Sequence, residues 1–423
     1  MSLHKPRSGL ILFGLCALLF SGCTQMESEN IVSEISAKTE LSVGWWGDDI
    51  RNEYMLQALS VFAQDHPEIQ LSMNYSTEED YDLMIQARDA ASMTCDVQQI
   101  SYDQLFDPQI QQKFFSLSSI KDFLNFHLLR NDAVSWGQID DVIYALSNSA
   151  DIPAFYYNKA LLDEYGVPVP ATWDELLALG DLCASDNRSL FSAADESFFL
   201  LITAWAEQTI GYPMFDEDQQ LQYDRDELSV MISLYQQLID HNVIVSSDSP
   251  AREVCSLETV GCISWSSYAS SLALSAASAN ISICTGPLLL DEPDAEFSGW
   301  YFRPGVLYVI RTDAEEPREA AKLLRFLINS DTIVQNQALN EGYPVAARST
   351  FLIPSTTFTQ TLSGQASSAY QQYKDEFSLI PPVLVSPSVH KSFFTFANRS
   401  LQSENQLATL ASQFLYSMQC LLA

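Results

Sequence analysis

Hydrophobic and polar positions from residue 41 onward alternate between the two-residue period of strands and the 3.6-residue period of helices. Short apolar segments predict strands, and longer segments with apolar residues at helical spacing lie between them. The first five segments read strand, helix, strand, helix and strand, over residues 41–46, 50–64, 69–75, 78–91 and 96–101. This order predicts a largely parallel sheet with helices on its faces.

The same alternation continues with other spacings. Thr172 and Glu175 form a capping box, which predicts a helix start, and Pro317 stands in the first turn of an amphipathic helix. After Pro354 the chain becomes rich in Ser, Thr and Gln, and the periodicity weakens. We expect helices near 194–209 and 224–241, and strands at 142–149, 152–158, 261–265, 281–286 and 306–311.

The first 22 residues have the pattern of a secretory signal peptide. Lys5 and Arg7 precede an apolar run over residues 9–20, which is too short to cross a bilayer about 30 Å thick. Small residues then stand directly before Cys23, as in a bacterial lipobox. We therefore expect lipid on Cys23, residues 23–40 as a flexible tether, and a protein held on the outer face of the bacterial cytoplasmic membrane. The alternative is an ordinary secreted protein.

The net charge of the chain excludes some classes of binding partner. The chain carries 21 basic and 54 acidic residues, a net charge of −33. Nucleic acids and anionic lipid headgroups both attract Lys and Arg, so this balance argues against either as a partner. We expect a soluble body, attached to the membrane through its lipid alone.

Six cysteines follow Cys23 in the sequence. Cys255 and Cys262 are close enough to pair in an exported protein, and buried free thiols are an equal alternative. No C-x-x-C motif occurs, so we expect no zinc site. The six are Cys95, Cys183, Cys255, Cys262, Cys284 and Cys420.

Catalytic motifs are missing from the sequence. It contains no H-E-x-x-H, G-x-S-x-G, P-loop or G-x-G-x-x-G, and its five histidines show no ligand spacing. Paired carboxylates such as Asp140 and Asp141 could serve a glycosidase, but 54 acidic residues produce such pairs by chance. We therefore expect a binding protein without cofactor or metal, and a secreted glycosidase is an alternative.

Several segments in one order resemble the extracellular solute-binding proteins of ABC importers, in the sugar-binding branch related to maltose-binding protein. The densest match is the strand, Tyr-Asn-Lys and Thr-Trp-Asp-Glu pattern of YALSNSADIPAFYYNKALLDEYGVPVPATWDELLALGDL. Further matches are a helix–Pro–strand opening, a third strand, and two late helices with a Gly-x-Pro-Val turn. The four segments are 144–182, 61–75, 95–101 and 315–347.

The resemblance implies two α/β lobes joined by a hinge, with one ligand between them. The chain would cross between lobes near residues 150, 300 and 340. We predict a first lobe from residues 41–150 plus 303–338, and a second from residues 151–302 plus 339–423. The implied partners are a carbohydrate and the permease subunits of an ABC importer, and the protein would act as a monomer. A binding protein that feeds a sensor kinase would look the same in sequence.

Aromatic and carboxylate residues at strand ends suggest the ligand. Aromatic rings cover the apolar faces of a sugar, and carboxylates accept hydrogen bonds from its hydroxyl groups. These groups favour a neutral mono- or oligosaccharide, and a polyamine or another amine is the alternative. Since Trp45 and Trp46 are adjacent on a strand, we expect one of them in the core. The candidate site residues are Trp45, Trp46, Asp48, Asp103, Asp151, Trp265, Trp300 and Tyr301.

Overall fold

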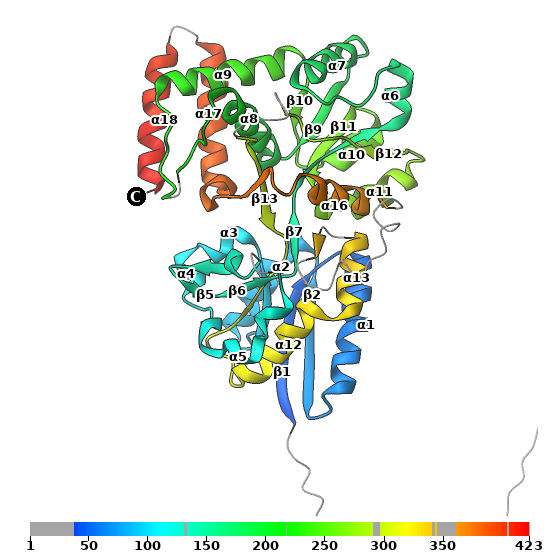
Figure 1. Ribbon diagram of the computed structural model, residues 1–423, viewed down its shortest axis with the longest axis vertical. Coiled ribbons are helices and arrows are strands. Elements are labelled where there is room, and N and C mark those ends of the chain that lie inside the picture. The colour runs from blue at the N-terminus through cyan, green and yellow to red at the C-terminus, as the bar shows by residue number, and fades with distance from the viewer. Residues whose placement is uncertain are drawn as a thin grey trace, which may run out of the picture. The chain divides into compact units, whose positions relative to one another are not determined.

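A computed structural model describes residues 38–130, 133–216, 218–290, 297–340, 343–344, 361–403 and 406–422 (Figure 1). The predicted signal peptide and Cys23 lie outside these residues, as does the tether up to residue 37. In the described part of the chain, no helix is both long and apolar enough to cross a bilayer.

The first lobe is built on a five-stranded sheet in the order β2-β1-β3-β14-β6. Its strands are β1 (Thr39–Trp46), β2 (Ile69–Ser76), β3 (Val97–Ile100), β6 (Ala145–Ser147) and β14 (Leu307–Ile310). The opening strands pair in parallel, as predicted, whereas β14 is antiparallel to both of its neighbours. Four of the five strands therefore run in one direction, and β14, which enters from the other lobe, is the one antiparallel strand of this sheet.

Helices connect and cover the strands of the first lobe. Helix α1 begins after Asp48, whose Oδ1 accepts a hydrogen bond from the backbone N–H of Arg51 (2.8 Å). A small hairpin, β4 (Gln138–Ile139) with β5 (Val142–Ile143), lies beside the main sheet. The helices are α1 (Asp49–Asp65), α2 (Glu78–Ala90), α3 (Tyr102–Leu105), α4 (Pro108–Gln111), α5 (Lys121–Leu124), α12 (Pro317–Asn329) and α13 (Asp331–Asn340).

The second lobe has its own mixed sheet, in the order β10-β9-β11-β8-β12. These strands are β8 (Pro153–Asn158), β9 (Ser189–Ala193), β10 (Ile244–Ser246), β11 (Thr259–Trp265) and β12 (Ile283–Thr285). Thr172 caps α7 as predicted, because its hydroxyl accepts a hydrogen bond from the Glu175 N–H. The helices up to residue 278 are α6 (Lys159–Tyr165), α7 (Trp173–Ser185), α8 (Asp195–Ile210), α9 (Arg225–Asp240), α10 (Pro250–Ser256) and α11 (Ala269–Ser278).

The described residues after Pro354, where the periodicity was weak, are largely helical. Helix α17 packs against both α8 and α18, so the last part of the chain closes one side of the second lobe (Figure 1). Its elements are α16 (Leu362–Tyr373), β16 (Phe377–Leu379), α17 (Pro387–Gln402) and α18 (Leu407–Leu422).

A third sheet runs between the lobes in the order β15-β7-β13-β16. Three of its strands, β7 (Ser149–Asp151), β13 (Trp300–Pro304) and β15 (Tyr343–Pro344), lie next to the three predicted crossings (Figure 1). Gly305 donates a backbone hydrogen bond to the Ser149 carbonyl (2.8 Å), and a Cβ at Gly305 would lie 2.1 Å from Ser149 Oγ. A side chain at this position would therefore have to displace the Ser149 hydroxyl where the two crossings meet.

The six cysteines after Cys23 are all free thiols, so Cys255 and Cys262 do not pair. Cys262 lies in the second-lobe sheet, and burial raises the pKa of its thiol to about 12. Burial likewise raises the pKa of Cys183 to about 12. Thiols held in this way stay protonated and inert, and pack as small apolar groups.

Candidate functional site

Two adjoining cavities, of about 670 and 700 Å³, are lined by residues of both lobes. Each has the size expected of a small-molecule site. They share seven lining residues and so form one cleft: Trp46, Glu78, Asp248, Tyr268, Ser271, Arg303 and Gly305.

The first lobe contributes the ends of β1 and β3 and the starts of α1 and α2. Trp46, the last residue of β1, is half-buried, and its ring packs against Tyr81 (centroids 5.0 Å apart). Asp48 and Asp103 also line the cleft, as the sequence predicted. Glu78 at the start of α2 was not among the predicted site residues, although it follows directly after a strand, as Asp48 does.

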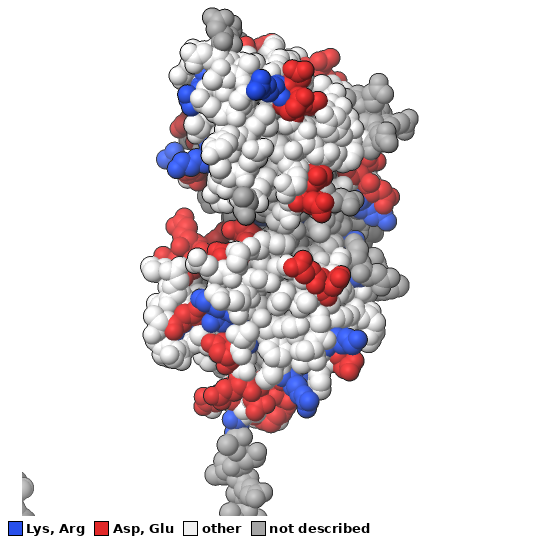
Figure 2. Space-filling view, turned by 90° about the vertical axis from the view of Figure 1, so that its left-hand side faces the viewer, with Lys and Arg blue, Asp and Glu red and all other residues white. Residues whose placement is uncertain are grey.

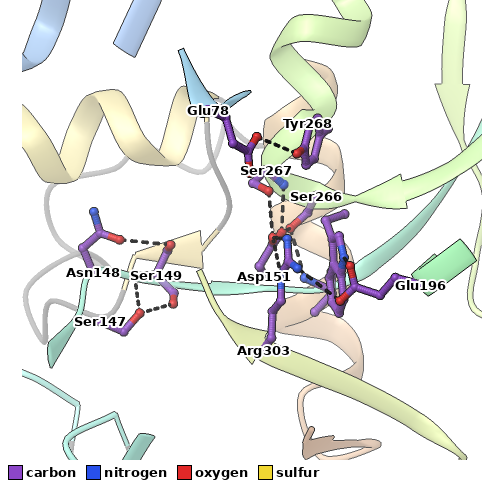
Figure 3. Close-up of polar contacts among 12 residues, drawn as sticks. Glu78, Ser147, Asn148, Ser149, Asp151, Glu196, Ser266, Ser267, Tyr268 and Arg303 are labelled. Carbon is purple, nitrogen blue, oxygen red and sulfur yellow. Dashed lines mark hydrogen bonds and ion pairs between the residues drawn. The ribbon is translucent and has the colours of Figure 1, made fainter. Parts of the chain in front are cut away.

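The second lobe contributes the segment after β11. Tyr268 is 41% exposed, and its hydroxyl donates a hydrogen bond to Glu78 Oε2 (2.8 Å). One helical turn later, Ser271 Oγ donates to Asp48 Oδ2 (3.2 Å). These two hydrogen bonds connect the lobes directly across the cleft (Figure 3 shows the first).

Asp151 is buried and fully engaged within the protein. Its Oδ1 accepts hydrogen bonds from Ser266 Oγ (2.5 Å) and from the Ser267 N–H (2.8 Å). Its Oδ2 accepts from Ser267 Oγ (2.7 Å) and from Nε and Nη2 of Arg303 (3.3 Å each). The side chain is 1% exposed and its oxygens are engaged by protein donors (Figure 3). The structure therefore does not leave Asp151 free to accept hydrogen bonds from sugar hydroxyls, which was the expectation from the sequence.

Arg303 is the residue that sequence reasoning missed at this place. It stands opposite Asp151 in the pairing of β7 with β13, and its Nη1 also contacts Glu196 Oε1 (3.3 Å). Its guanidinium carbon lies 3.9 Å from the ring centroid of Trp265, which is a cation–π contact. Trp265 lines the cleft as expected, but it is 3% exposed and Arg303 covers its ring.

Trp300 and Tyr301 lie in the core of the second lobe rather than in the cleft. The Trp300 indole donates to the Leu289 carbonyl (2.8 Å), and the Tyr301 hydroxyl donates to Glu207 Oε2 (2.8 Å). The indoles of Trp205, Trp173 and Trp300 are nearly parallel in series, with centroids 4.8 and 6.3 Å apart. The structure therefore places Trp300 and Tyr301, which the sequence offered as ligand contacts, away from both cavities, because both faces of β13 are covered at these positions.

Trp45 is the core member of its pair, as alternation along β1 requires. It is fully buried, stacks on Tyr75 (4.8 Å), and donates its indole N–H to Asn52 Oδ1 (2.9 Å). Trp46 is therefore the half of the pair that faces the cleft.

Across the described ranges, no group of three or more His, Cys, Asp or Glu side chains is placed to hold a metal ion. The cleft itself is lined by aromatic rings, carboxylates and several serine hydroxyls. Such a lining can hold a polar molecule by hydrogen bonds and ring contacts.

Two lobes, three crossing strands and a cleft lined from both sides define a binding protein for a small solute. The chain belongs to the family of bacterial extracellular solute-binding proteins, whose family model matches residues 57–352. This confirms the resemblance seen in the sequence.

One sequence relative matches part of the chain at low identity. A multiple sugar-binding protein of Streptococcus mutans is 23% identical over 198 residues, which are 46% of this chain and 44% of that protein. The match thus spans less than half of that relative's length.

Two solved structures are similar over almost their full length. A periplasmic solute binding protein from Pectobacterium atrosepticum has a TM-score of 0.78 at 23% identity, covering 91% of this chain and 98% of that one. A periplasmic oligogalacturonide binding protein from Yersinia enterocolitica, in complex with saturated digalacturonic acid, has a TM-score of 0.78 at 20% identity, covering 91% and 99%. These likenesses support the two-lobed fold.

Proposed function

We propose that the protein captures a mono- or oligosaccharide in the cleft between its lobes and delivers it to an ABC importer. The observation that carries the proposal is the cleft itself, where Trp46 and Tyr268 stand among carboxylates and serine hydroxyls. A half-buried ring can cover the apolar face of a pyranose, while the oxygens around it bond the hydroxyl groups. The sugar-binding relative in Streptococcus mutans supports the same ligand class.

A thermal-shift screen against a panel of mono- and oligosaccharides tests this function. A specific ligand at about 100 times its dissociation constant adds about 2.7 kcal/mol to the free energy of unfolding. The expected result is a raised melting temperature with one class of saccharide, followed by one-to-one binding in calorimetry without cleavage of the ligand. Slow hydrolysis of a bound saccharide would instead favour a glycosidase.

Truncation of the cleft ring gives the sharpest variant. Trp46→Ala removes a ring that lines both cavities, and we expect affinity for the saccharide to fall by about thirtyfold. Tyr75→Ala is the matched control, because Tyr75 is an exposed ring of the same lobe that lines neither cavity. Equal affinity of the two variants in calorimetric titration would exclude Trp46 from the site.

We also propose that Cys23 carries the lipid that holds a monomeric protein on the outer face of the cytoplasmic membrane. The support is the small-residue pair before Cys23 together with the short apolar run. Metabolic labelling with a fatty-acid probe should mark the wild-type chain and leave Cys23→Ala unlabelled. Labelled Cys23→Ala protein that stays on the cells would refute the anchor.

A further inference from the structure

Side chains from both lobes meet at one place in the cleft. Glu78 and Asp48 come from the first lobe, and each accepts a hydrogen bond from the same turn of the second lobe, from Tyr268 (2.8 Å) and Ser271 (3.2 Å). Trp46 stands two residues before Asp48 and lines both cavities. Both carboxylates and both rings therefore line the same cavity of about 700 Å³ (Figure 3 shows Glu78 and Tyr268).

The cleft is strongly acidic. Seven carboxylates line it against three arginines, and the Arg303 guanidinium is already held between Asp151 and Glu196. Elsewhere too the surface carries patches of acidic side chains with scattered basic ones (Figure 2). The other five cleft carboxylates are Asp48, Glu78, Glu79, Asp103 and Asp248.

Two helices of the first lobe begin at the cleft, and both starts are closed to anions. A helix N-terminus commonly binds phosphate or carboxylate through its free N–H groups. Here Asp48 caps α1 with its own side chain, and the first turn of α2 is Glu78, Glu79 and Asp80. An anionic ligand would meet carboxylates at both places, so these groups favour a ligand of the opposite charge.

Aromatic faces combined with carboxylates form the usual setting for an ammonium group. The cation is attracted by the ring face, and its N–H groups donate to the carboxylates. We propose that the ligand is a carbohydrate with a protonated amino group, and that Glu78 and Asp48 hold this ammonium beside Trp46 and Tyr268. The inference rests on the proposed saccharide function and adds the charge of the ligand to it.

Three disaccharides that share the same ring form and the same linkage test whether the charge of the amino group matters. They are the glucosamine dimer, its N-acetylated form and cellobiose. Calorimetric titration of the full chain should show the dimer of free amines binding at least ~tenfold more tightly than the other two, with a difference that shrinks at high salt. Cellobiose or the N-acetylated dimer binding as tightly as the diamine would overturn the inference and leave the saccharide function standing. Failure of the whole saccharide panel would overturn the saccharide function itself.

The substitution Glu78→Gln tests whether the Glu78 carboxylate binds the ammonium group of the ligand. The amide oxygen can still accept the Tyr268 hydrogen bond, so the variant removes charge and keeps the contact between lobes. We expect affinity for the diamine to fall about tenfold and affinity for cellobiose to change by less than about twofold. Asp174→Asn, an exposed charge change on α7 that does not line the cleft, is the control and should bind like wild type. Equal losses for both saccharides in Glu78→Gln would contradict the assignment.

Discussion

Trp300→Ala is expected to lower the free energy of unfolding by about 3–5 kcal/mol, the usual loss for an indole removed from a core. Trp300 is the end of the series of three indoles and also meets Phe155 edge to face (5.6 Å). The substitution also leaves the buried Leu289 carbonyl without its donor. Urea denaturation followed by tryptophan fluorescence measures the loss.

Measuring ligand affinity distinguishes a structural role of Trp300 in the core from a role in ligand contact. Because Trp300 lines neither cavity, the folded fraction of Trp300→Ala should bind saccharide with wild-type affinity. Trp300→Phe serves as the milder control, since it keeps an aromatic ring in the core. A variant that melts like wild type but loses its ligand would return Trp300 to the binding site.

Stability should fall as pH rises because of one buried acid in the second lobe. Burial raises the pKa of Glu207 from its ordinary value of 4.5 to about 8. The folded state then holds a proton that the unfolded state releases, so the stabilisation is complete below about pH 4.5 and is lost as pH rises toward 8. The difference of about 3.5 pKa units corresponds to up to about 5 kcal/mol.

Glu207→Gln tests this contribution directly. Glu207 Oε1 accepts a hydrogen bond from the Met214 N–H (2.8 Å), and Oε2 lies 2.8 Å from the Tyr301 hydroxyl. In Glu207→Gln the amide oxygen can still accept from Met214, and the amide N–H can donate to the Tyr301 oxygen as the O–H of the protonated acid does. Unfolding free energies measured by urea at about pH 5 and about pH 8.5 should agree with wild type at the lower pH and exceed it at the higher one. The same pH dependence in both proteins would show that Glu207 does not hold the proton.

The sequence predicted the local elements well because their signals are local. Alternation along β1 requires that Trp45 and Trp46 face opposite sides of the sheet. The structure adds which of the two faces the cleft. The capping box at Thr172 likewise depends on neighbours in the chain. Asp48 and Asp103, chosen because they follow parallel strands, line the cleft, and their contact with a ligand stays a prediction.

The errors at the site arose from contacts between distant parts of the chain. Asp151 is neutralised by Arg303 and bonded by Ser266 and Ser267, all more than 100 positions away. Trp300 is buried by residues distant in the sequence, such as Leu289, whose carbonyl accepts its indole N–H, and Phe155. One signal was available: an arginine within the apolar strand WYFRP needs a buried acidic partner, and that partner is Asp151.

The order of strands in the first-lobe sheet has a consequence for synthesis of the chain. Strand β14 lies between β3 and β6, so this sheet is incomplete until residues 307–310 have been made. Synthesis at about 5–20 residues per second places roughly 8–32 s between residue 147, where β6 ends, and residue 307. During that interval the edges of β3 and β6 have no partner strand and can pair with other chains. A chain that stops before residue 307 therefore leaves these edges of the first-lobe sheet unpaired.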